Sequence, residues 1–169
     1  MTVPPLYTAS VPVFLHYLDR LGGLVDRTEG RDEVLDARLQ PDMFGFAQQV
    51  ATAASFTLRV AFPLAGLAVP RSPDGGMDRA GLAARLAATR AGLASLDPTD
   101  FAGAEVRQIT HRAGFAELTQ DGATFLHLFG MPNFLFHAGM AFAILRANGI
   151  EIGKADFDGQ HDYPPGFRF

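Results

Sequence analysis

The chain has 169 residues, a length that suits a single domain over residues 1–169 with a sizeable buried core. The formal net charge is -4 at pH 7 and no basic stripe follows the sequence, so no nucleic-acid partner is expected. Cysteine is absent, which excludes disulfides and cysteine metal sites and suits a cytoplasmic location. The first residues lack a positively charged segment followed by an apolar core, so no secretory signal is expected. The longest apolar stretch, residues 50–69, contains Arg59 and Pro63, which predicts a buried helix and no membrane partner.

Apolar residues at helical spacing predict a first helix over Ser10–Asp26, with Ser10 as its N-cap. The adjacent Gly22 and Gly23 lie inside it, and we interpret them as positions where a neighbouring helix packs closely. A second, alanine-rich helix is predicted over Pro41–Phe62.

The second helix is expected to kink or end at Pro63. Residues 68–77 contain prolines and adjacent glycines, which predicts a loop. A third helix is predicted over Asp78–Ser95, with Asp78 able to cap it.

The pattern then changes to alternation, which predicts a small β-hairpin. Its strands are expected over Glu105–Thr110 and Phe115–Thr119, with a turn at Arg112–Gly114. Asp121–Gly122 is compatible with a further turn or with the cap of a short helix that reaches Phe129, and we favour the helix.

A last long helix is predicted over Pro132–Asn148, with Gly149 able to take a positive φ just beyond it. Residues 150–169 form a tail rich in glycine, proline and aromatic residues. Together these elements predict an all-α, up-down-down-up four-helix bundle with a β-hairpin insertion before the last helix.

The last helix carries one histidine, His137, with Asn133 one turn earlier, among phenylalanine, leucine and isoleucine residues. Buried polar groups cost free energy unless they find partners. Gln49 falls on the expected inner side of the second helix. We predict that Gln49, Asn133 and His137 converge on one cavity and hold a small polar ligand, although a satisfied core histidine has the same pattern.

The other histidines do not predict a metal centre or a cofactor, because no H-x3-H or HExxH spacing is present. His16 is expected to be exposed on the first helix, His111 and His127 lie in or beside the hairpin, and His161 lies in the tail.

Phenylalanine is more frequent than one bundle interior of this size needs, so part of it is expected in the core and part in a homodimer contact. The phenylalanines considered are Phe44, Phe46, Phe56, Phe129, Phe134, Phe136 and Phe142.

Two segments resemble a known family. They comprise Pro132–Phe134, Phe136–His137, Ala141–Phe142, Ile144–Arg146, Asn148–Gly149 and Gly153–Phe157, together with Pro41–Phe44 and Phe46–Gln49. In these motifs the chain resembles an uncharacterised bacterial family related to the DinB/YfiT-like four-helix-bundle superfamily, over residues 7–159.

The resemblance implies a DinB-like bundle with a cavity. Members of the superfamily commonly bind a divalent metal through three histidines, one on the second helix and two on the last; several are thiol-dependent transferases, and dimers are common. This chain has Gln48 or Gln49, Asn133 and His137 at the matching positions. One imidazole with two carboxamides is a poor ligand set for zinc or nickel, so a degenerate pocket is implied.

The leading hypothesis is a cytoplasmic small-molecule-binding or structural module, homodimeric and without a cofactor. One alternative is a metal-dependent transferase or hydrolase that uses His137. A second alternative is a pure dimerisation scaffold.

Overall fold

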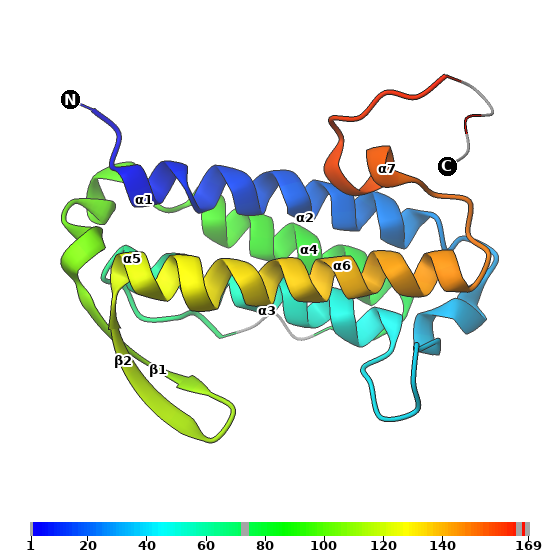
Figure 1. Ribbon diagram of the computed structural model, residues 1–169, viewed down its shortest axis with the longest axis horizontal. Helices are drawn as coiled ribbons and strands as arrows, with labels where there is room; N and C mark the ends of the chain where they lie inside the picture. The colour runs from blue at the N-terminus through cyan, green and yellow to red at the C-terminus, as the bar shows by residue number, and fades with distance from the viewer. Residues whose placement is uncertain (1, 72–74, 165–166, 168–169) are drawn as a thin grey trace.

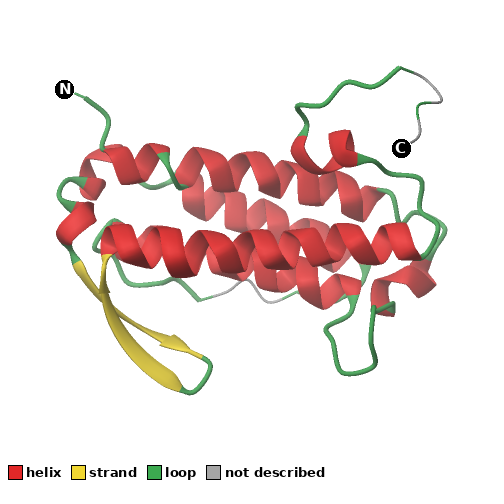
Figure 2. Ribbon diagram, in the orientation of Figure 1, coloured by secondary structure: helices red, strands yellow, loops and turns green. Residues whose placement is uncertain are grey.

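Four long helices, α2, α3, α4 and α6, pack side by side in the computed structural model (Figures 1 and 2), which describes residues 2–71, 75–164 and 167. Following the colours in Figure 1, α2 and α6 run in one direction and α3 and α4 in the other. The predicted all-α, up-down-down-up bundle with a hairpin before its last long helix is therefore confirmed.

The elements follow one another along the chain. They are α1 (Pro5–Thr8), α2 (Val11–Asp26), η1 (Asp32–Asp36), α3 (Phe46–Leu64), α4 (Arg79–Ala94), η2 (Pro98–Phe101), η3 (Ala104–Val106), β1 (Gln108–Ala113), β2 (Ala116–Asp121), α5 (Gly122–Thr124), the π-helical turn η4 (Phe125–Gly130), α6 (Met131–Ala147) and α7 (Lys154–Asp158).

The first long helix begins where it was predicted, but Ser10 does not cap it with its side chain. The Ser10 hydroxyl instead donates to the Leu6 carbonyl oxygen at 2.5 Å, because the additional short helix α1 precedes α2. The interpretation of Gly22 and Gly23 as close-packing positions was wrong. A Cβ atom at either residue would meet nothing within 4 Å, so the two glycines leave open space beside α2.

The second long helix begins at Phe46, five residues later than predicted. Gly45 lies against η1, where an added Cβ would come 3.0 Å from the Asp36 carbonyl oxygen. The Phe46 N–H donates to the Ala37 carbonyl oxygen at 2.9 Å. These contacts hold the Pro41–Gly45 segment in turns, and Pro63 falls in the last turn of α3, one residue before the helix ends.

The predicted third helix is confirmed as α4. Asp78 is its N-cap, and the carboxylate accepts a hydrogen bond from the Gly81 N–H at 2.7 Å.

The predicted hairpin is present, with both of its edges shifted. β1 starts at Gln108 because Glu105 and Val106 belong to η3. The strands pair antiparallel from Gln108 opposite Asp121 to Ala113 opposite Ala116, which leaves a two-residue turn. Gly114 opens that turn with a φ of 61°, the conformation that a II′ turn requires at this position.

Asp121 caps a helix, as favoured from the sequence, by accepting hydrogen bonds from the Thr124 N–H and hydroxyl, both at 2.9 Å. The helix does not stop before Pro132, however. The turn η4 is π-helical and leads directly into α6, so helix continues from Gly122 to Ala147. Pro132, which lacks the N–H of the regular ladder, is the second residue of α6 and follows the π-helical turn directly.

This Gly122–Ala147 run is the one helix, among the described residues, that is long and apolar enough to cross a membrane by length and composition. Its most apolar window has a mean hydropathy of 1.5 and is 33% buried. In the sequence, the stretch weighed as a possible membrane span is residues 50–69, which lies outside this run. In the bundle, α6 packs along α3, and Phe134 is fully buried against Phe14 with ring centroids 5.1 Å apart.

The tail, predicted to be irregular, contains the short helix α7, which packs on α2. His16 Nε2 lies 2.7 Å from the Asp158 carbonyl oxygen, and His16 is half-buried. The expectation that His16 is exposed was wrong, because α7 covers the side of α2 that faces away from the bundle core. Residues 165–166 and 168–169 of the tail lie outside the described residues.

Candidate functional site

The bundle brings two of the three predicted site residues together. His137 Nδ1 on α6 lies 2.7 Å from Gln49 Oε1 on α3. The Gln49 side chain is buried, and its amide nitrogen donates to the Phe44 carbonyl oxygen at 3.5 Å. This second bond turns the amide so that its oxygen faces the imidazole. Since that oxygen only accepts, Nδ1 of His137 carries the proton.

Three phenylalanine rings surround the His137 imidazole. Phe56 lies nearly parallel to it with centroids 5.5 Å apart, and Phe44 lies nearly parallel at 6.2 Å. Phe136 approaches edge-on at 5.3 Å. We call Phe44, Phe56 and Phe136 the phenylalanine cage.

Burial among these rings lowers the pKa of the His137 imidazole below its ordinary value. The imidazole is therefore neutral at pH 7. With Nδ1–H held by Gln49, the lone pair of Nε2 is the free acceptor, and no described residue donates a hydrogen bond to it. A neutral imidazole fixed through its other nitrogen is prepared to accept a proton or a hydrogen bond.

Asn133, the third predicted residue, is placed differently. Its side-chain amide donates to the carbonyl oxygen of Phe129, one turn earlier, at 2.7 Å, and it makes no hydrogen bond to Gln49 or His137. Asn133 instead lines a neighbouring cleft. The cage residue Phe56 lies in the wall of the same cleft, so the cleft adjoins the His137 site.

This cleft has a volume of about 340 Å³ and lies between the hairpin turn, α3 and the start of α6. It is lined by Phe56, Arg59, Arg112, Ala113, Gly114, Phe129 and Asn133. We call it the hairpin cleft.

Residues 6–158 match a family described as Domain of unknown function (DUF1993). The chain belongs to the DUF1993 family. A solved structure described as a DinB family member protein from Shewanella denitrificans is 31% identical to it, covers 94% of each chain and has a TM-score of 0.83. The DUF1993 protein thus has the DinB-like fold that its motifs imply. The comparison with curated proteins gives no match.

The residues of this DUF1993 protein do not fit the three-histidine metal centre of the wider superfamily. Gln49 Oε1 already accepts from His137, and the Asn133 amide is bonded within its own helix. No group of three His, Asp or Glu side chains suited to a metal occurs in the described part of the chain. His111 and His161 are bonded elsewhere, to Gln120 and Asp158 respectively. The described residues thus offer no ligand set for such a metal.

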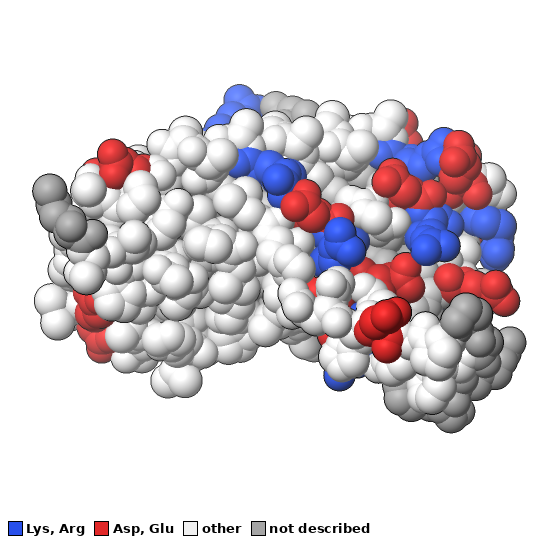
Figure 3. Space-filling model, turned by 90° about the horizontal axis from the view of Figure 1, so that it is seen from above, with Lys and Arg blue, Asp and Glu red and all other residues white. Residues whose placement is uncertain are grey.

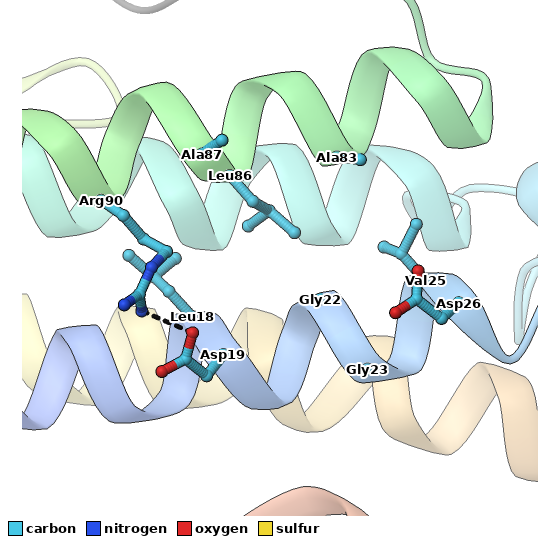
Figure 4. Close-up of a pocket in the computed structure, with 10 residues that line it drawn as sticks. All are labelled: Leu18, Asp19, Gly22, Gly23, Val25, Asp26, Ala83, Leu86, Ala87 and Arg90. Atoms are coloured by element: carbon cyan, nitrogen blue, oxygen red, sulfur yellow. Dashed lines mark ion pairs between the residues drawn. The ribbon is translucent and has the colours of Figure 1, made fainter.

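A second hollow of about 300 Å³ lies between α2 and α4 (Figure 4). Gly22 and Gly23 form its floor, and an ion pair of 2.6 Å between Arg90 and Asp19 closes one end. The two glycines that resemble a packing motif in the sequence thus open a groove. This groove is lined by residues of α2 and α4, whereas the His137–Gln49 contact joins α6 to α3.

Sequence reasoning missed the contribution of Arg59 and the cage ring of Phe44 in this DUF1993 protein. Arg59 follows Phe56 by three residues on α3, a spacing that places two side chains on one face, and this signal was present in the sequence. Phe44 precedes α3 in a turn segment that was predicted to be helical, so its direction was not predictable from periodicity.

Proposed function

We propose that this protein binds a small polar molecule that donates a hydrogen bond to Nε2 of His137. The observation that carries the proposal is the 2.7 Å bond between His137 Nδ1 and the buried Gln49 oxygen. It holds a neutral imidazole in one orientation, with its second nitrogen available. Pockets that bind small molecules typically combine apolar walls with a few fixed polar groups, and the phenylalanine cage and the Gln49–His137 pair have this composition.

Asn133 is proposed as a second polar contact, from the hairpin cleft. One amide N–H is used by the Phe129 carbonyl, which leaves the second N–H and the amide oxygen for a ligand. A ligand that reaches Asn133 from His137 passes Phe56, because this ring belongs to both walls.

Phenol is a suitable probe, since it is a small ring with one hydroxyl donor. We expect phenol to shift the amide NMR signals around His137, and His137→Phe to weaken its binding by about tenfold, the effect of losing one hydrogen bond in a confined site. His127→Phe is the matched control, because His127 is exposed on η4. Equal binding by the wild type and His137→Phe would contradict the proposal.

Metal content separates this proposal from a metal-dependent transferase or hydrolase. Protein purified without a histidine tag is expected to contain no stoichiometric zinc or nickel. If the protein contains one metal ion per chain and His137→Phe loses it, the metal-dependent enzyme replaces the binding proposal.

We also propose that the protein is a homodimer that pairs through the outer side of η4 and α6. Leu128, Leu135 and Phe136 on this side are 74%, 37% and 53% exposed. On the face seen in Figure 3, charged side chains gather toward the α7 end, while much of the other end of that face is uncharged. An exposed apolar face of this kind typically marks a protein interface, and a second copy carries the same apolar face to cover it.

The expected result for this pairing is a dimer of the wild type at micromolar concentration and a monomer of the Leu128→Glu/Leu135→Glu variant, measured by light scattering after size exclusion. Leu118→Glu is the control, because Leu118 is 39% exposed but lies on the hairpin. A monomeric wild type would rule the pairing out.

A further inference from the structure

We infer that the hairpin cleft binds the carboxylate of an acidic ligand, with Arg59 as its principal contact. This inference rests on the proposed function for the other end of the ligand, and it defines the chemical class of that ligand. The cleft holds about 340 Å³, enough for one small ring with its acid group.

Arg59 is held in position but its charge is not neutralised. Its guanidinium carbon lies 4.6 Å from the centre of the Phe56 ring, and Nη2 donates to the Arg112 carbonyl oxygen at 3.3 Å. A guanidinium has five N–H donors, and this is the one hydrogen bond that Arg59 makes to a described residue. No ion pair joins Arg59 to a carboxylate in residues 2–71, 75–164 and 167.

The hairpin brings a second arginine to the same cleft. Arg112, the second-last residue of the strand β1, lines it, and the Arg112 carbonyl oxygen fixes Arg59. The carboxylate that the strand register places opposite Arg112 is that of Glu117, and the two side chains form no ion pair. The Arg59 guanidinium, held without an acidic partner among the described residues, favours an anion beside it, and the planar fork of arginine matches a carboxylate.

Phe56 connects the cleft to the His137 site. The same ring lies 5.5 Å from the His137 imidazole and 4.6 Å from the Arg59 guanidinium. A ligand in the cleft beside this ring therefore lies close to a cation, and the same ring contacts a neutral hydrogen-bond acceptor. Asn133 contributes an uncharged polar group to the wall of the cleft.

Benzoate and benzamide test the charge requirement, because they have the same shape and differ in charge. We expect the wild type to bind benzoate at least about tenfold more tightly than benzamide, since hydrogen bonds to charged groups are stronger than neutral ones. Arg59→Met, which retains a flexible side chain over Phe56, is expected to abolish this preference. Arg59→Lys is expected to retain part of it. Arg38→Met, which removes an exposed arginine from the loop before α3, is expected to leave it unchanged.

Two results would overturn the inference: equal affinity of the wild type for the two probes, or an unchanged benzoate preference in Arg59→Met with an unchanged unfolding midpoint. The phenol titration separates this failure from that of the proposed function. Phenol binding that depends on His137, without any benzoate preference, leaves the proposed function standing and removes the acid site. If the benzoate preference depends on Arg59 but phenol binding is unchanged in His137→Phe, the acid site stands and the proposed function fails.

Discussion

Gly122→Ala is expected to be among the most destabilising single substitutions in this protein. A Cβ atom at position 122 would lie 2.0 Å from the Ala104 carbonyl oxygen and 3.1 Å from the Leu64 side chain. The nearest atom belongs to the backbone, so no flexible side chain can move aside. We expect the free energy of unfolding to fall by about 3 kcal/mol or more, the upper end for overpacking, in urea titrations.

Gly139→Ala is the matched control for this substitution. Gly139 also lies in the Gly122–Ala147 run, but its added Cβ would meet nothing within 4 Å. Alanine is the better helix former, so Gly139→Ala is expected to stabilise the protein by about 0.5–1 kcal/mol. If the two variants unfold at the same urea concentration, the close contact between η3 and the start of α5 is absent in solution. That contact fixes where the helix that carries His137 begins.

Gln49→Leu is the second substitution expected to lower the stability strongly, and it is also expected to weaken phenol binding. Leucine fills a similar volume but cannot accept the His137 Nδ1–H, which leaves a half-buried donor without a partner. A lost partner of this kind costs about 1–3 kcal/mol of stability. The imidazole also loses the contact that orients it, so phenol binding is expected to fall with the stability.

Gln48→Leu provides the comparison, because Gln48 precedes Gln49 on α3 and is exposed. This control is expected to change neither the urea midpoint nor phenol binding. Gln49→Glu is a second variant. A carboxylate beside Nδ1 raises the pKa of His137, which is opposite to the lowering caused by burial. If Gln48→Leu and Gln49→Leu have the same urea midpoint and the same phenol binding, the Gln49 bond to His137 contributes to neither.

The bundle was predictable because its helices carry strong local signals. Asp78 and Asp121 are caps in the sequence and in the structure, and Gly149, with a φ of 77°, ends the last long helix as predicted. The start of α3 was not predictable. It depends on Gly45 packing against η1, a contact between segments that helical periodicity does not describe.

The contact between Gln49 and His137 was predictable to the same extent. Inward stripes on two helices identified Gln49 and His137, and a stripe is sufficient to bring two side chains together in a bundle. The same reasoning also selected Asn133, whose amide bonds to its own helix at the π-helical turn. An inward stripe indicates which side of a helix faces the core, but it does not indicate where an individual side chain points. Arg59 needed the hairpin, since Arg112 on β1 holds it in place.

The pH dependence of stability follows from the lowered pKa of His137. In the folded protein this pKa lies below the ordinary value of 6.5 that the unfolded chain retains. Between the two values the unfolded chain binds more protons, so the free energy of unfolding falls as the pH drops below about 6.5 and levels off below the folded pKa. His137→Phe is expected to remove this part of the pH dependence.

The most direct test of a neutral, Gln49-held imidazole is a ¹⁵N NMR titration of the His137 ring in the wild type. We predict that at pH 7 the proton is on Nδ1, that Nε2 is unprotonated, and that the ring titrates below 6.5. In Gln49→Leu the preference for Nδ1 is expected to disappear. A wild-type ring protonated on Nε2 at pH 7, or one that titrates at or above 6.5, would contradict the account.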